Sequence, residues 1–156
     1  GINLDKTPPA VVWIGNAGTY TVEQTVSITC AATDALSGVA STTCQDVSGP
    51  AYGFPLGASA FSAEAVDFAG NTGSGAATIS VIVTAPSLAI LTSRFVTDSA
   101  IANSLNVKLN GYLRAIDRPN RLNILNGYKN ELEAQIGRVV SDQDAQILLA
   151  LASALP

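Results

Sequence analysis

Hydrophobic and polar side chains alternate along the first half of the chain, in short runs that turn residues separate. The run TVSITCAATD places Val26, Ile28 and Cys30 on one face of an extended segment. The runs FSAEAVDF and ATISVIVT repeat this alternation, with glycine, proline or asparagine between the runs. A period of two is that of a half-buried β-strand. Roughly six or seven such strands in about 80 residues predict an antiparallel β-sandwich.

From residue 86 onward, apolar positions recur at steps of three and four, which is the period of an α-helix. Four short helices are predicted, and each has a residue suited to its first turn: Ser87, then Thr97 or Asp98, then Pro119, and finally Ser141. Gly137 is expected to end the third helix. Short connections between short helices predict a compact bundle. The chain is therefore expected to divide into a β-domain, residues 1–85, and an α-domain, residues 86–156.

The composition is that of a folded protein, with 47% hydrophobic and 13% charged residues in a chain of 156. Residues 1–85 carry one basic and six acidic side chains, net −5, and residues 86–156 carry seven basic and six acidic ones, net +1, which together give −4. Such a balance offers no basic surface, so nucleic acid is not an expected partner. The longest apolar stretch is far shorter than the roughly 20 residues that span a bilayer, so no membrane insertion is expected.

Cys30 and Cys44 are the only cysteines in the sequence, which also lacks histidine. A zinc site needs four ligands, and a redox pair has the shorter CxxC spacing. A structural disulfide is the remaining interpretation, and it would close a loop of 15 residues. The chain begins at Gly1 and contains no methionine, which we interpret as a processed or excised piece of a longer protein.

The stretch AVDFAGN, residues 65–71, has three interpretations. Hard oxygen ligands for a weak calcium site would come from Asp34, Asp46, Asp67 and Asn71. A catalytic acid and base would pair Asp67 with Glu64 or Asp34, but no arginine or histidine accompanies them. In the third interpretation, Asp67 and Asn71 bond the backbone of a hairpin turn in which Gly70 supplies the conformational freedom. The sequence favours this hairpin turn, and it predicts no catalytic residue and no dedicated metal site.

Exposed aromatic rings would indicate a sugar-binding surface, and the candidates for stacking are Trp13, Tyr20 and Tyr52. Trp13 shares a strand face with Val11, so burial between sheets is an equal alternative for it. The two tyrosines flank turns, where packing at a rim is the commoner outcome. Aromatic residues make up only 6% of the chain, which is few for a stacking surface.

Two segments resemble known families. The DKTPP entry, the stretch TYTVEQTVSITCAATDALSGVASTTC and the closing AVDFAGNTGSG resemble the bacterial Ig-like repeats related to the hyalin-repeat family, over residues 5–84. The stretches LTSRFVTDSAIANSLNVKL and LNGYKNELEAQIGRVVSDQDAQILLALA resemble the FIMAH domain, a small helical module of secreted bacterial hydrolases, over residues 88–155. These resemblances imply an all-β Ig-like antiparallel sandwich followed by a small all-α C-terminal domain, in a secreted or cell-surface multidomain parent.

We therefore expect a non-catalytic extracellular accessory module that spaces or docks parts of a larger protein. Its partners would be other domains of the parent protein or neighbouring subunits. The first alternative is a polysaccharide-binding module of a secreted hydrolase, and the second is a structural subunit of an extracellular filament or surface layer. No enzyme activity is expected, because the sequence lacks histidine and both cysteines are assigned to a disulfide. No cofactor is expected apart from weakly bound calcium.

Overall fold

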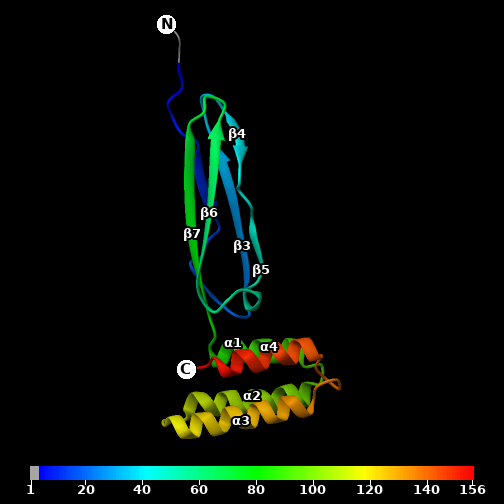
Figure 1. Ribbon diagram of the computed structural model, residues 1–156. Helices are drawn as coiled ribbons and strands as arrows, with labels where there is room; N and C mark the ends of the chain where they lie inside the picture. The colour runs from blue at the N-terminus through cyan, green and yellow to red at the C-terminus, as the bar shows by residue number, and fades with distance from the viewer. Residues whose placement is uncertain (1–3) are drawn as a thin grey trace. The chain divides into compact units, whose positions relative to one another are not determined.

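The computed structural model describes residues 4–156, and its first half consists of seven strands (Figure 1). Their bounds are β1 (Ala10–Ile14), β2 (Thr19–Thr21), β3 (Thr25–Thr33), β4 (Val39–Thr42), β5 (Val47–Pro50), β6 (Gly57–Asp67) and β7 (Thr72–Ile82). One sheet has the order β1-β3-β5 and the other the order β2-β7-β6-β4. A short 3₁₀ turn, η1 (Ala51–Gly53), follows β5. The alternation read from the sequence thus corresponds to strands in both sheets.

The longest pairing joins β6 and β7 as an antiparallel hairpin, which Figure 1 shows in green. Every second side chain is buried at the start of β3, with Val26 and Ile28, and at the end of β7, with Ile79 and Val81. These side chains form the core of the strand region by removing apolar surface from water. The outward positions between them are polar or exposed.

Glycine lets the backbone of β1 approach β7 closely. A Cβ atom added to Gly75 would lie 2.5 Å from the carbonyl oxygen of Val11, and one added to Gly73 would lie 1.9 Å from that of Pro9. Both distances are too short for any residue with a side chain. The two glycines therefore fix how β1 lies against this sheet.

The second half of the chain contains four helices, α1 (Ala85–Phe95), α2 (Ser99–Arg114), α3 (Arg118–Ala134) and α4 (Asp142–Ser153). Side chains cap all four N-termini: those of Thr84, Asp98, Asp117 and Ser141 each accept a backbone N–H bond. The sequence predicted Ser87 as the first cap, whereas α1 begins earlier and Ser87 is the reciprocal partner of Thr84 in a capping box. The helix therefore starts directly after β7, with only residues 83–84 between them.

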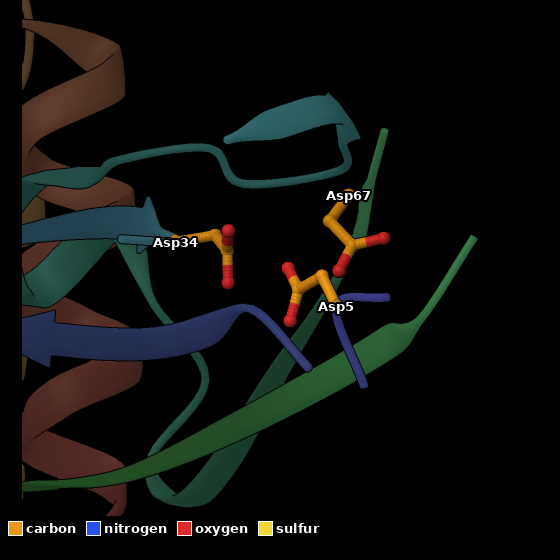
Figure 2. A group of neighbouring side chains, drawn as sticks. All are labelled: Asp5, Asp34 and Asp67. Atoms are coloured by element: carbon orange, nitrogen blue, oxygen red, sulfur yellow. The ribbon is translucent and has the colours of Figure 1, made fainter. Parts of the chain in front are cut away.

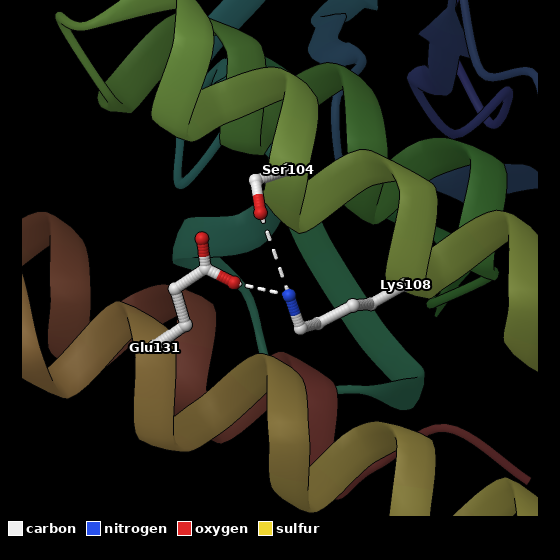
Figure 3. A network of polar contacts seen from close by, with 3 residues as sticks. All are labelled: Ser104, Lys108 and Glu131. Atoms are coloured by element: carbon white, nitrogen blue, oxygen red, sulfur yellow. Dashed lines mark hydrogen bonds and ion pairs between the residues drawn. The ribbon is translucent and has the colours of Figure 1, made fainter.

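Leucine side chains fill the interior of the helical region. α1 contacts α2 and α4, and α3 contacts the same two helices. The fully buried side chains are Leu88, Leu91, Leu105, Leu109, Tyr128, Leu132 and Leu148. One buried polar pair joins α1 to α3, with the Tyr128 hydroxyl 2.7 Å from the Thr92 Oγ1. Nearer the surface, Lys108 of α2 bonds Ser104 of the same helix and forms an ion pair with Glu131 of α3 (Figure 3).

The predicted fold class, a β-sandwich followed by a separate all-α domain, is wrong. The chain is a mixed α/β fold with about 39% helix and about 32% strand, and a separate all-α C-terminal domain is not shown. Contacts divide the chain into two compact units, but the unit that holds the helices also includes Thr21–Glu23, which are the end of β2 and the turn after it, and Ile82, the last residue of β7. Periodicity locates the change from strands to helices, but it cannot detect strand residues that pack with the helices. The division into domains at residues 85 and 86 stays a prediction.

The predicted disulfide is confirmed: Cys30 and Cys44 are bonded, with their Cα atoms 5.3 Å apart. The bond ties β3 to the segment between β4 and β5. In the part of the chain that the structure describes, no helix has the length and apolar character needed to cross a membrane.

Candidate functional site

Three aspartates from distant parts of the sequence meet at one end of the strand region (Figure 2). Asp5 precedes β1, Asp34 directly follows β3, and Asp67 is the last residue of β6. One carboxylate oxygen from each lies within 4.8 Å of those of the other two. β1 runs antiparallel to β3, so the entry to β1 and the exit from β3 lie at the same end of the sheet. We call Asp5, Asp34 and Asp67 the carboxylate cluster.

The loop after β3 is built around Asp34. Its Oδ1 accepts backbone N–H bonds from Leu36 (3.1 Å), Ser37 (2.8 Å) and Gly38 (2.8 Å). Its Oδ2 receives no hydrogen bond from the described residues and stays available to a ligand. Asp5 is held to the same loop, because its Oδ2 accepts the N–H of Ser37 at 3.1 Å. The loop therefore brings two carboxylates together.

Asp67 organises the turn between β6 and β7. Its Oδ1 accepts the backbone N–H of Asn71 and its Oδ2 accepts the Asn71 side-chain amide, both at 2.7 Å. Gly70 has a φ of +88°, a conformation that side chains disfavour, and its N–H bonds the Asp67 carbonyl. Asn71 also donates to the backbone carbonyl of Asp5 at 3.3 Å. The hairpin turn favoured by the sequence is thus also the junction between the N-terminal segment and the sheet.

Hydrogen bonds lower the pKa of two members of the cluster, Asp5 and Asp67. The Ser37 hydroxyl and the Thr7 N–H lower the pKa of Asp5 below its ordinary 3.8, although burial and the charge of Asp67 oppose them. Burial acts to raise the pKa of Asp67, whose side chain is only 2% exposed, but bonds from Asn71 and Ser37 outweigh it and lower the pKa. No ion pair with a lysine or arginine neutralises these carboxylates among residues 4–156. Within the described residues, the cluster is therefore a compact negative site that no lysine or arginine pairs with.

Repulsion within such a cluster has a cost. Two unit charges about 5 Å apart repel by about 1 kcal/mol in water and by about 3 kcal/mol at an effective dielectric constant of 20. A cation among the carboxylates would turn this repulsion into attraction. Calcium binds oxygens at about 2.3–2.6 Å, so oxygens on opposite sides of one ion lie about 5 Å apart, a span that accommodates the cluster.

The structure separates the residues that the sequence grouped as calcium ligands. Asp34 and Asp67 lie together, but Asp46 lies elsewhere, where its Oδ1 accepts the N–H of Cys30 at 3.0 Å. Asn71 touches the cluster as a hydrogen-bond donor through its amide nitrogen. Asp5 was missed by the sequence analysis. Its position just before the first strand was the available signal. If that strand pairs antiparallel with β3, Asp5 lies at the same end of the sheet as Asp34.

Of the two candidate catalytic pairs, Asp67 with Asp34 is close together in the structure and Asp67 with Glu64 is not. Glu64 is exposed on β6, and it is not part of the carboxylate cluster. Asp34 and Asp67 are close together, but the pKa of Asp67 is lowered. An acid–base pair needs one carboxyl group whose pKa is raised enough to hold a proton. This geometry suits binding a cation better than moving a proton.

The candidate sugar-stacking residues also separate. Tyr20 is only 5% exposed, and its hydroxyl accepts the N–H of Ala17 at 3.0 Å, so its ring is packed, which is the alternative to stacking that the sequence analysis gave for it. Tyr52 is half-buried in η1. Trp13 is half-buried and packs against Phe61, with ring centroids 6.3 Å apart.

No protein-family model matches the chain, and no curated protein or solved structure matches it. The resemblances drawn from the sequence motifs therefore stay predictions. Function is therefore inferred from the residues of the site itself.

Proposed function

We propose that this chain is a non-catalytic structural module of an extracellular protein, in which the carboxylate cluster binds calcium and fixes the N-terminal segment to the strand region. The observation that carries the proposal is the convergence of Asp5, Asp34 and Asp67 from three separate segments. The Cys30–Cys44 disulfide supports an extracellular location, because such bonds persist in oxidising compartments. The motif resemblance to repeats of secreted proteins supports the same location.

Calcium suits the cluster better than the other common metals. All the side-chain ligands are carboxylate oxygens, which hard cations prefer, and no histidine is present in the sequence. Calcium also tolerates irregular coordination and completes its shell with backbone carbonyls and water. Magnesium requires a near-ideal octahedron, which three carboxylates on separate segments do not readily provide.

Binding would have a mechanical consequence. Asp5 belongs to the segment that enters the first strand, whereas Asp34 and Asp67 belong to the body of the strand region. An ion shared by all three would hold the entering segment at a fixed angle. A segment held in this way transmits orientation to whatever precedes it in a longer protein, which is the work of a spacer.

The test is thermal unfolding of the full chain with calcium and with a chelator. Calcium at about 100 times its Kd would stabilise the folded state by about 2.7 kcal/mol. For a protein of this size, that corresponds to a rise of roughly 5–10 °C in melting temperature. Magnesium at the same concentration is expected to have a much smaller effect.

Matched asparagine variants separate binding from general stability. Asp34→Asn keeps an oxygen that can accept the three loop N–H bonds but removes the charge, so it is expected to lose the calcium response. Asp46→Asn likewise keeps its bond to Cys30 and lies outside the cluster, so it is expected to respond like the wild type. Equal melting temperatures of the wild type in calcium and in chelator would refute the proposal.

A further inference from the structure

A second region of the strand unit has the composition of a ligand site. Trp13 of β1, Phe54 after η1 and Phe61 of β6 line one hollow of about 390 Å³. All three rings are half-buried, so each presents some of its surface to the hollow. The volume lies within the range of about 300–1,000 Å³ that small-molecule sites occupy. We call this hollow the aromatic groove.

Polar side chains surround the aromatic rings. The lining includes hydroxyl, amide and carboxylate groups from Thr43, Gln45, Asp46, Ser48 and Ser62. Two bonds hold the segment that carries the first three: the disulfide at Cys44 and the bond from the Cys30 N–H to Asp46. The rim is therefore fixed to β3 and is ready to bind without rearrangement.

The indole N–H of Trp13 is a hydrogen-bond donor without an acceptor among the described residues. Its nitrogen is also shielded from solvent. Buried N–H groups without an acceptor are uncommon in folded proteins and call for a partner such as a water or a ligand oxygen. Because the nitrogen is shielded from solvent, a ligand hydroxyl in the groove would accept its N–H only after the indole ring turns.

We propose that the aromatic groove binds a segment of an uncharged polysaccharide. A sugar ring has an apolar C–H face that fits an aromatic ring and hydroxyl groups that fit a rim of hydroxyl and amide side chains. The only ionisable group in the lining is Asp46, and residues 1–85 carry a net charge of −5. Anionic polysaccharides are disfavoured for that reason. This inference does not depend on calcium binding, because the groove and the carboxylate cluster share no residue.

Trp13 is the only tryptophan in the sequence, so tryptophan fluorescence of the full chain reports directly on the groove. The probes are hexasaccharides of glucose, xylose, mannose and N-acetylglucosamine, with hexagalacturonate as the anionic comparison and a polyproline peptide as the peptide comparison. We expect a saturable fluorescence change with at least one uncharged hexasaccharide and none with hexagalacturonate or the peptide.

Variants assign the change to the groove. Phe54→Ala removes one wall and is expected to weaken binding about tenfold. Gln45→Ala, an exposed rim position that leaves the core intact, is also expected to weaken it. Phe68→Ala removes a ring that is 76% exposed outside the groove and is expected to bind like the wild type. No response to any uncharged hexasaccharide, a response to polyproline or hexagalacturonate instead, or equal loss in Phe68→Ala would overturn the proposal.

Discussion

Asp67 is nearly buried, yet it is kept charged by the hydrogen bonds that surround it. Both Asn71 bonds satisfy its carboxylate, and the Asn71 amide also reaches the N-terminal segment. One asparagine thus connects the hairpin turn to the entry of the first strand. The same contacts make the stability of this region depend on pH.

The first residue-scale prediction concerns acid. The pKa values of Asp5 and Asp67 are lowered in the folded chain, so their contribution is complete above the unfolded value near 3.8 and is lost as the pH falls through the lowered folded values. Without calcium, we expect stability to fall below about pH 4. Urea unfolding across this pH range measures the effect. An Asp67→Asn variant with the same acid slope as the wild type would contradict it.

The second residue-scale prediction concerns the buried pair of Thr92 and Tyr128 in the helices. Thr92 Oγ1 donates to the Leu88 carbonyl at 2.9 Å, so the Tyr128 hydroxyl donates to Thr92. Tyr128→Phe should therefore cost about 1 kcal/mol, the usual net value of one hydrogen bond. Burial raises the pKa of Tyr128 to about 12, so the wild type should also lose stability as the pH rises from about 10 towards 12. Chemical unfolding of the variant checks both effects, and an alkaline loss of equal size in Tyr128→Phe would contradict the second.

At the scale of the elements, the close approach of β1 and β7 determines how the strand region closes. Gly75→Ala would place a methyl group 2.5 Å from the Val11 carbonyl oxygen and 2.9 Å from its Cγ1 atom. The backbone of β1 would have to move, and we expect a loss of about 1–3 kcal/mol or more. Gly53→Ala is the matched control, because the nearest neighbour of its added methyl group would be the Pro50 ring at 3.9 Å, an ordinary contact distance. Thermal unfolding compares the two, and an equal loss in both variants would refute this account of β1.

Most elements could be predicted from the sequence, because strand and helix periods and capping residues are local signals. Asp98, Pro119 and Ser141 lie at helix starts as expected. The start of α1 was misplaced by a few residues, because Thr84 and Ser87 are both good caps and only their reciprocal bonds select Thr84. A local sequence pattern does not decide between two capping residues that lie three positions apart.

At the scale of the whole molecule, the sequence predicted the disulfide but not the fold class or the complete site. The predicted fold class was wrong because Thr21–Glu23, at the end of β2, and Ile82, at the end of β7, group with the helices, a long-range relation that periodicity does not contain. The site was incomplete because Asp5 and Asp34 are 29 positions apart and only strand pairing brings them together. Asp46 was grouped with them by residue type, although it lies elsewhere.

Calcium binding by the carboxylate cluster is tested most directly by equilibrium dialysis of the full chain. The calcium that the chain retains is then measured by emission spectroscopy. We expect about one calcium ion per wild-type chain, held by Asp5, Asp34 and Asp67. Asp34→Asn should lose the ion and Asp46→Asn should keep it, since Asp34 alone of these two belongs to the carboxylate cluster. No calcium on the wild-type chain, or a full equivalent on Asp34→Asn, would contradict the account.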